Sequence, residues 1–205
     1  NQKQAARLGA TGEFASLLAQ IGLVGKLIAQ DLRRAGLMDI LGTTGEINVH
    51  GETVKKLDEI ANETFLKVFH HSGLVCALAS EEMEKPILLQ ENWPQAKYML
   101  LFDPLDGSSN TDCNMPLGAI FSVVKSARND RMPTEDELAR KGTEQVAAGY
   151  LLYGSSTMLV YTVGQGVHGF TLELGIGEYL LSHEQIRIPA RGKVYGVNEG
   201  NYHKW

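Results

Sequence analysis

From residue 74 onward, the sequence consists of short apolar segments that alternate with turn-forming residues. The segments are LVCALAS, PILLQ, KYMLLF, GAIFSVV, VAAGYLLYG, TMLVYTV, GVHGFTLE and GEYLLS. Short apolar runs bounded by glycine and polar residues are typical of β-strands. From VAAGYLLYG to QIRIPA, the segments follow one another at the spacing of hairpins. The pattern therefore predicts a largely antiparallel sheet.

Two helical segments precede these strands. In residues 12–37, apolar side chains recur at helical spacing, and basic residues and a glycine close the segment. A second helix is expected from about Thr53 to Phe69, and the polar stretch LGTTGEINVHGE should be a loop between the two. A short helix is expected after Pro133. Helices followed by an antiparallel sheet favour an α+β layered fold over a doubly wound parallel one.

Composition narrows the classes of function. The net charge of −5 and the absence of a basic stripe argue against a nucleic-acid partner. No apolar stretch is expected to approach the length needed to span a membrane, and the N-terminus shows no signal-peptide core. The sequence does not begin with Met, so we expect further residues upstream. Cys76 and Cys113 fit no metal motif or disulfide framework and are interpreted as structural, which favours a cytoplasmic protein.

The segment FDPLDGSSN, residues 102–110, places two acids directly after an apolar run. If the strand ends at Phe102, Asp103 and Asp106 can share one side of a tight turn. Such close carboxylates repel each other unless a cation intervenes. An isolated D-x-x-D more often caps a helix or forms a turn. Here, however, the small residues of GSSN can direct backbone N–H groups at an anion. Acids for a cation beside amides for an anion indicate a metal-assisted phosphate site.

Other acids could join this site. Glu81 and Glu82 follow a predicted strand, and Glu52 and Asp58 lie near the start of the second helix. For the latter two, a solvated helix surface is the simpler interpretation when they are considered alone. All of these are hard oxygen ligands, which favours Mg²⁺ or Mn²⁺ over Zn²⁺.

Two familiar phosphate motifs are absent from the sequence. There is no P-loop, and the spacing of the acids differs from the D-x-D of phosphatases that form an aspartyl phosphate. The expected nucleophile is therefore a metal-activated water.

The blocks FDPLDGSSN, ASEEMEK, QVAAGYLLYGSSTMLVYTVGQGVHGFTLE and YGVNEGNY together resemble fructose-1,6-bisphosphatase, of the Mg-dependent, lithium-sensitive phosphatase superfamily. The resemblance covers essentially the whole chain. It implies an αβαβα layered fold in the full protein. It also implies a metal-site and allosteric domain over residues 1–192 and the start of a substrate domain over residues 193–205.

The resemblance assigns roles to individual residues. The implied reaction is hydrolysis of the 1-phosphate of fructose 1,6-bisphosphate to fructose 6-phosphate and phosphate, a step of gluconeogenesis. Two or more metal ions would be bound by Glu81, Asp103, Asp106, Glu52 and the carbonyl group of Leu105. Glu82 and Asp58 would be catalytic, orienting or deprotonating the attacking water. The substrate would be held by Asp106, Gly107, Ser108, Ser109, Asn198 and Tyr202.

Two features depart from the family pattern. Glu52 stands where some members carry an aspartate, so it keeps the charge but has a longer side chain. Family members also continue well beyond the NEG block, into a half that supplies most contacts to the 6-phosphate. We therefore expect residues 1–205 to be inactive alone.

The resemblance implies an inhibitory AMP site near the start of the first helix. Lys125 replaces an expected arginine, which keeps the charge but loses bidentate geometry. The alternative is that the segment TGE merely caps the helix and that Lys97 is an ordinary surface residue. The implied residues are Thr11, Gly12, Glu13, Phe14, Lys97, Tyr98 and Lys125.

Several alternatives stay open. The substrate could be sedoheptulose 1,7-bisphosphate, alone or together with the fructose compound. The inositol-phosphate and nucleotide-phosphate branches are disfavoured by NEGNY and AAGYLLYGSSTM. A light-controlled plastid enzyme is disfavoured because SARNDRMPTEDELARKG contains no cysteine. A non-catalytic module that binds AMP or a sugar phosphate is a different class, and this fragment alone could act so. The histidines are interpreted as surface or core residues, and a homotetramer is expected from the family.

Overall fold

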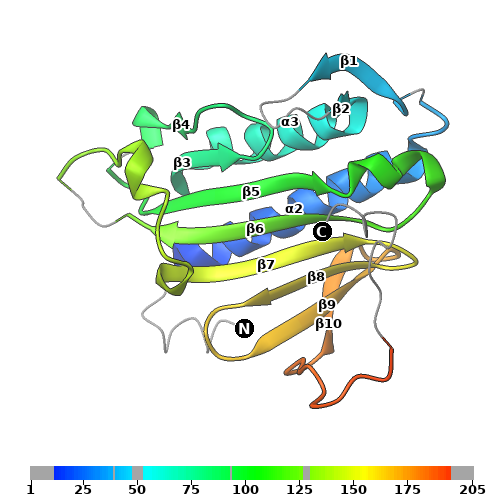
Figure 1. The fold of residues 1–205 in the computed structure, drawn as a ribbon. Coiled ribbons are helices and arrows are strands. Elements are labelled where there is room, and N and C mark those ends of the chain that lie inside the picture. Colours follow the sequence, from blue (N-terminus) through cyan, green and yellow to red (C-terminus); the bar gives the residue numbers. More distant parts are fainter. Residues whose placement is uncertain (1–11, 39, 48–52, 93, 127–129, 195–205) are drawn as a thin grey trace, which may run out of the picture.

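The computed structural model describes residues 12–38, 40–47, 53–92, 94–126 and 130–194. Two long helices, α2 (Gly12–Arg34) and α3 (Lys56–His70), pack against a large sheet, as Figure 1 shows. The predicted α+β class is confirmed.

The large sheet has eight strands in the order β10-β9-β8-β7-β6-β5-β3-β4. All neighbouring pairs are antiparallel except β3 and β5, which are parallel. Each predicted apolar segment forms a strand, but QIRIPA does not. The strands are β3 (Val75–Ser80), β4 (Ile87–Leu88), β5 (Tyr98–Asp106), β6 (Leu117–Lys125), β7 (Gln145–Tyr153), β8 (Thr157–Thr162), β9 (Val167–Glu173) and β10 (Glu178–His183).

The stretch between the helices was expected to be a loop, but it is not loop throughout. It contains β1 (Thr43–Ile47) and β2 (Thr53–Lys55), which form a separate antiparallel pair. The second helix therefore begins at Lys56 rather than at Thr53. Thr53 and Val54 are β-branched, which favours the strand over the helix at this point.

Helix α2 lies along one face of the sheet and buries the face that carries its periodic apolar residues. Leu17, Ile21 and Val24 are completely buried there. Gly25 lies where the helix comes closest to the sheet, because a Cβ atom added at this position would lie 2.5 Å from a methyl group of Leu151. A side chain at this position would force the ends of neighbouring side chains to move, so glycine fits this contact best.

Among the described residues, α2 is long and apolar enough to cross a membrane by length and composition. The expectation that no stretch approaches such a length is therefore wrong. The buried residues of α2 belong to the main hydrophobic core, and a core helix satisfies the same criteria.

Helix α3 covers the same face of the sheet farther along. The ring of Phe65 stacks on that of Phe102 in β5, with centroids 4.3 Å apart. The core thus lies between the two helices and the sheet residues that alternate toward them.

A smaller cluster covers part of the opposite face. Cys76, Met99 and Val124 pack there with Leu138, which follows the short 3₁₀ helix η3 (Glu135–Glu137). This helix begins just after Pro133, close to the predicted place. The Cys76 thiol lies 3.3 Å from the carbonyl oxygen of Tyr98, and burial raises the pKa of the thiol to about 11. Cys76 is therefore a structural residue, as predicted.

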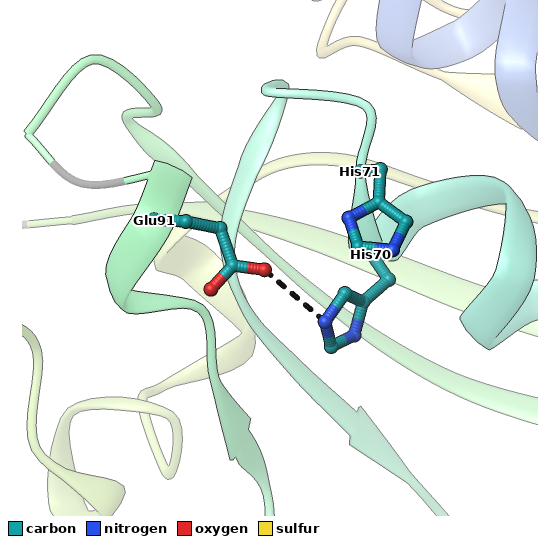
Figure 2. Close-up of side chains that lie close together, drawn as sticks. All are labelled: His70, His71 and Glu91. Atoms are coloured by element: carbon teal, nitrogen blue, oxygen red, sulfur yellow. Dashed lines mark ion pairs between the residues drawn. The ribbon is translucent and has the colours of Figure 1, made fainter.

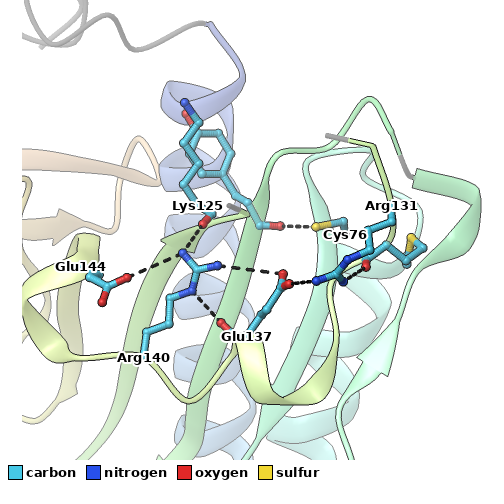
Figure 3. Close-up of polar contacts among 8 residues, drawn as sticks. Cys76, Lys125, Arg131, Glu137, Arg140 and Glu144 are labelled. Carbon is cyan, nitrogen blue, oxygen red and sulfur yellow. Dashed lines mark hydrogen bonds and ion pairs between the residues drawn. The ribbon is translucent and has the colours of Figure 1, made fainter. Parts of the chain in front are cut away.

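An ion-pair network holds the segment that contains η3, as Figure 3 shows. Glu137 pairs with Arg131, and the Arg140 side chain donates hydrogen bonds to the carbonyl oxygens of Glu137 (2.8 Å) and Lys125 (3.1 Å). Arg140 also lies 3.8 Å from Glu144, near the short helix η4 (Gly142–Glu144). These contacts attach the segment to the end of β6.

Candidate active site

Strand β5 does not end at Phe102 but continues to Asp106. Asp103 lies opposite Ile120 and Asp106 lies opposite Gly118, so β5 contains one extra residue in this interval. Such a bulge bends the strand and redirects its side chains. The N–H group of Leu105 donates a 3.1 Å hydrogen bond to Oδ1 of Asp103, which fixes this carboxylate within the bulge.

The chain turns sharply just after the bulge. Gly107 has a φ of +83°, a conformation that favours glycine. It precedes the 3₁₀ helix η2 (Ser108–Cys113), and its carbonyl oxygen accepts a 2.9 Å hydrogen bond from the N–H group of Asn110. The first N–H groups of a helix have no acceptor within it. The N–H groups of Ser108 and Ser109 are the first of η2 and lie just after the acidic bulge in the chain.

Glu81 reaches the same region because it follows β3, which runs parallel to β5 and ends beside Phe102, just before the bulge. Ser80, the last residue of β3, lies opposite Phe102, and the N–H group of Glu81 donates a 3.0 Å hydrogen bond to the Phe102 carbonyl oxygen. Glu82 follows in the turn, where its N–H group donates to Oγ of Ser80 at 3.3 Å. The predicted strand end at SEE is confirmed.

Asp58 lies in the first turn of α3 and is only 3 % exposed. The interpretation of Asp58 as solvated helix surface is therefore wrong. Its Oδ2 atom accepts a 3.0 Å hydrogen bond from the N–H group of Lys55. Its Oδ1 atom is buried and has no hydrogen-bond partner in the described structure. Burial raises the pKa of Asp58 despite hydrogen bonds from Lys55 and Ser108, and the nearby charge of Glu81 raises it further.

The pKa of Asp103 is raised to about 6. Burial is the largest cause and the hydrogen bond from Leu105 opposes it, while the charges of Asp106, Glu81 and Asp58 add to the increase. Asp106, Glu81 and Asp58 thus lie close enough to Asp103 for their carboxylates to repel it. Such repulsion is relieved when a cation lies between the acids.

A group of three His, Cys, Asp or Glu side chains can hold a metal ion when one ligand atom from each lies within 4.8 Å of the others. In the described part of the chain, one such group occurs, and it is not at the acidic bulge. The bulge acids therefore converge without closing into a coordination shell. The group that does meet this distance is formed by His70, His71 and Glu91. Sequence reasoning missed it, although a pair of adjacent histidines at the end of a predicted helix was visible. Glu52, Asn198, Tyr202 and Thr11 lie outside the described residues.

The residues predicted for AMP come together at the other end of β5. Lys97 lies 3.8 Å from Glu13 in the first turn of α2, and the rings of Phe14 and Tyr98 are 5.5 Å apart. Tyr98 is paired with Lys125 in the register of β5 and β6. The start of α2 thus meets the start of β5, and Gly12 is exposed at the helix start. The AMP site itself stays a prediction.

A cleft of about 580 Å³ adjoins this group between α2 and strands β8 to β10. Its lining includes Phe14, Leu18, Tyr161 and Phe170, so its walls are mainly apolar. Clefts of this size and character are typical of small-molecule sites.

Known proteins match both the sequence and the fold. Residues 1–184 match the family model described as fructose-1-6-bisphosphatase, N-terminal domain. The class 1 fructose-1,6-bisphosphatase of Trichodesmium erythraeum is 57 % identical over 94 % of this chain and 55 % of its own length. That of Trichormus variabilis is 55 % identical over 94 % of this chain and 56 % of its own.

The solved structures agree with these relatives. The holo form of Leishmania major fructose-1,6-bisphosphatase superposes with a TM-score of 0.89 at 41 % identity, covering 95 % of this chain and 61 % of that one. Its T-state structure gives a TM-score of 0.79 at 40 % identity, covering 95 % and 59 %. The chain spans about half the length of the curated relatives it matches. Over that length, this chain belongs to the fructose-1,6-bisphosphatase family.

Proposed function

We propose that this chain supplies the metal-binding half of a phosphatase that hydrolyses the 1-phosphate of fructose 1,6-bisphosphate. The observation that carries the proposal is the convergence of Glu81, Asp103, Asp106 and Asp58 beside the turn at Gly107. Carboxylates next to the backbone amides of a helix start suit a phosphate group that is bound through a cation.

The donor set at the bulge fits a hard divalent cation. Glu81, Asp103 and Asp106 provide carboxylate oxygens, and Leu105 adds a backbone carbonyl group, which is the ligand type that Mg²⁺ and Mn²⁺ prefer. The unpartnered Oδ1 atom of Asp58 is a further buried oxygen in the same region. Two or more such ions, with Glu52 as an additional ligand, are part of the proposal. When bound, they supply Lewis acidity toward the phosphoryl oxygens and lower the pKa of a bound water.

Asp58 and Glu82 are proposed to handle the proton of the attacking water. The Lys55 N–H group fixes Oδ2 of Asp58 and leaves Oδ1 without a partner. Because burial raises the pKa of Asp58, its carboxylate is a better proton acceptor than an exposed aspartate. Glu82, in the turn after β3, is proposed to orient the same water.

The turn after the bulge is proposed to hold the 1-phosphate. The amides of Gly107, Ser108 and Ser109 lie at the start of η2, where they have no acceptor within the helix. Asn198 and Tyr202 are proposed to contact the 6-phosphate. The protein is further proposed to be a cytoplasmic homotetramer.

Phosphate release from fructose 1,6-bisphosphate by the full-length gene product tests this function. We expect release that requires Mg²⁺ and that falls at least a hundredfold in kcat when Asp103 is changed to Asn, about 3 kcal/mol of transition-state stabilisation. Asp136→Asn is the matched control, because Asp136 is exposed in η3. Residues 1–205 alone should show no turnover. Equal activity of the Asp103→Asn and Asp136→Asn proteins would refute the proposal.

The same assay separates the alternatives. Comparison of kcat/KM for fructose 1,6-bisphosphate and sedoheptulose 1,7-bisphosphate decides between a selective and a dual-substrate enzyme. Mg²⁺ binding without turnover of either compound would favour the non-catalytic module.

AMP binding is a second proposal, and the contact between the start of α2 and Lys97 and Tyr98 supports it. Calorimetry with AMP should give a binding heat that Lys97→Ala weakens at least tenfold. Lys141→Ala is the matched control, because Lys141 is exposed just before η4. Absence of heat up to millimolar AMP would contradict this proposal.

A further inference from the structure

We propose that His70, His71 and Glu91 form a second cation site, which takes a transition metal such as Zn²⁺ and is separate from the acidic bulge. Figure 2 shows the three side chains, which extend toward one another from the end of α3 and from the 3₁₀ helix η1 (Gln90–Asn92). The inference rests on these residues alone and does not depend on the phosphatase proposal.

The spacing of the donor atoms carries the argument. One ligand atom from each residue lies within 4.8 Å of the other two. Nε2 of His70 is 3.1 Å from Oε1 of Glu91, and the two imidazole centroids are 4.6 Å apart. Ligands of a tetrahedral zinc ion lie about 3.4 Å from each other, given bond lengths of ~2.0–2.1 Å. The first pair is close to this spacing, and a ligand atom of His71 lies within 4.8 Å of both.

The end of α3 explains how two adjacent histidines can converge. His70 is the last helical residue, and His71 is the C-cap with φ of −104° and ψ of 16°. Neighbouring side chains within a helix point about 100° apart around its axis. Because the helix ends between these residues, their rings instead meet edge to face, with an interplanar angle of 70°.

A buried asparagine positions the carboxylate. The Asn92 side chain donates 3.0 Å hydrogen bonds to the carbonyl oxygens of His70 and Val75. Asn92 is only 7 % exposed, so it attaches η1 firmly to the end of α3. Glu91, its neighbour, is thereby held opposite His70. Hydrogen bonds that fix the backbone help to hold the side chains of a site in position.

The donor chemistry indicates the class of metal. Two imidazole nitrogens and one carboxylate oxygen suit Zn²⁺, Co²⁺, Ni²⁺ or Cu²⁺ and disfavour Mg²⁺. Three protein ligands leave a position for water, and the partly exposed side chains give a metal ion direct access. The carbonyl end of α3 also favours a positive charge.

This site is distant from the acidic bulge. Asp58 lies in the first turn of α3 and His70 ends the helix, so at ~1.5 Å per residue nearly the whole helix separates them. A metal at His70, His71 and Glu91 would therefore join α3 to η1 without touching the phosphate-binding turn. The competing explanation is a surface ion pair between His70 and Glu91, which would contribute little to stability.

Titration of the full-length gene product with Co²⁺, in the presence of saturating Mg²⁺, tests the proposal. Co²⁺ bound by histidine in a four- or five-coordinate site produces visible absorption bands, which Zn²⁺ should abolish by displacement. We expect one Co²⁺ per chain with these bands. We expect His71→Ala and Glu91→Gln each to weaken binding at least tenfold, while His183→Ala, an exposed histidine in β10, leaves binding unchanged.

Two further measurements keep the outcome decisive. Thermal unfolding of each variant without metal verifies that it is folded, and Zn²⁺ should raise Tm for the parent and for His183→Ala but not for His71→Ala. Asp103→Asn should retain the cobalt bands. Absence of bands, or bands lost in Asp103→Asn and retained in His71→Ala, would overturn the proposal and leave a surface ion pair only.

Discussion

Asp103 shows how a single residue at the bulge connects stability with function. Its carboxylate lies in a region where burial and three neighbouring acids disfavour the charged form. The same arrangement is favourable for binding a cation, because the cation removes the repulsion. Under the proposed metal-binding role, the site lowers the stability of the metal-free fold and gains affinity for a cation.

Asp103→Asn is expected to stabilise the metal-free protein at neutral pH. The pKa of Asp103 in the folded state is about 6, above its ordinary value, so the folded state retains this proton more tightly than the unfolded state. Stability therefore falls as the pH rises from about 4 to about 6, and the full penalty remains above that range. Because the side chain is partly exposed, we expect a gain of only ~1 kcal/mol above pH 6.

Denaturant unfolding in EDTA at pH 4 and at pH 7.5 measures this effect. The advantage of Asp103→Asn should vanish at the lower pH, and Asp136→Asn should show no advantage at either. Added Mg²⁺ should stabilise the parent protein more than Asp103→Asn. A variant that is less stable than the parent at pH 7.5 without metal would contradict the prediction.

The sequence indicated which acids could act together at the bulge, but it did not indicate how buried each of them is. The spacing of Asp103 and Asp106 was enough to suggest a shared cation. The burial of Asp58 could not be predicted, because it depends on where α3 meets η2 and not on local pattern. The meeting of His70 with Glu91 was hidden for the same reason, since Asn92 links segments that are separated in sequence by β3.

At the scale of elements, the packing of α2 and the central strands depends on two glycines. A Cβ atom at Gly25 would meet a methyl group of Leu151 and, at 2.7 Å, the hydroxyl group of Tyr179. A Cβ atom at Gly149 in β7 would lie against the carbonyl oxygen of Val160 and, at 2.6 Å, the ring of Phe121. The first contact involves the ends of side chains, whereas the second involves the backbone of the neighbouring strand.

We therefore expect Gly149→Ala to destabilise the fold more than Gly25→Ala. Side-chain ends can shift, so Gly25→Ala should lower the free energy of unfolding by about 1–3 kcal/mol, partly offset by the helix propensity of alanine. A strand backbone in the middle of the sheet cannot shift as easily, so Gly149→Ala should exceed that range. Denaturant unfolding should show little change for the control Gly142→Ala, which has open space around it. The opposite order would show that α2, and not the sheet, resists displacement.

The elements themselves could largely be predicted from apolar periodicity, but their irregularities could not. The extension of β5 past Phe102 was missed because Pro104 normally argues against a strand. The bulge accommodates the proline, and the position of the bulge depends on how β5 pairs with β6. The pair of β1 and β2 was missed because a polar, glycine-rich stretch carries no apolar alternation.

At the scale of the whole molecule, the two faces of the sheet differ. Helices α2 and α3 cover one face, and the segment around Leu138 covers part of the other. On the remainder of that second face, Ile120, Tyr150 and Leu152 are 49 %, 44 % and 38 % exposed. Large apolar side chains gathered on one sheet face are typical of a surface that packs against another layer. The αβαβα arrangement and the boundary near residue 192 remain predictions that this face makes testable.

Replacing both Ile120 and Leu152 with Thr should affect stability differently in residues 1–205 and in the full-length gene product. Threonine retains the β-propensity of a branched residue but removes apolar area. In residues 1–205, the double variant should bind less of a hydrophobic dye, with unfolding free energy within ~0.5 kcal/mol of the parent, because these side chains are exposed. In the full-length gene product, where a further layer would bury them, it should cost about 1–3 kcal/mol. Leu37→Thr, 88 % exposed beyond α2, is the control. An equal cost in both lengths would mean that no layer covers this face, and the αβαβα expectation would then be wrong.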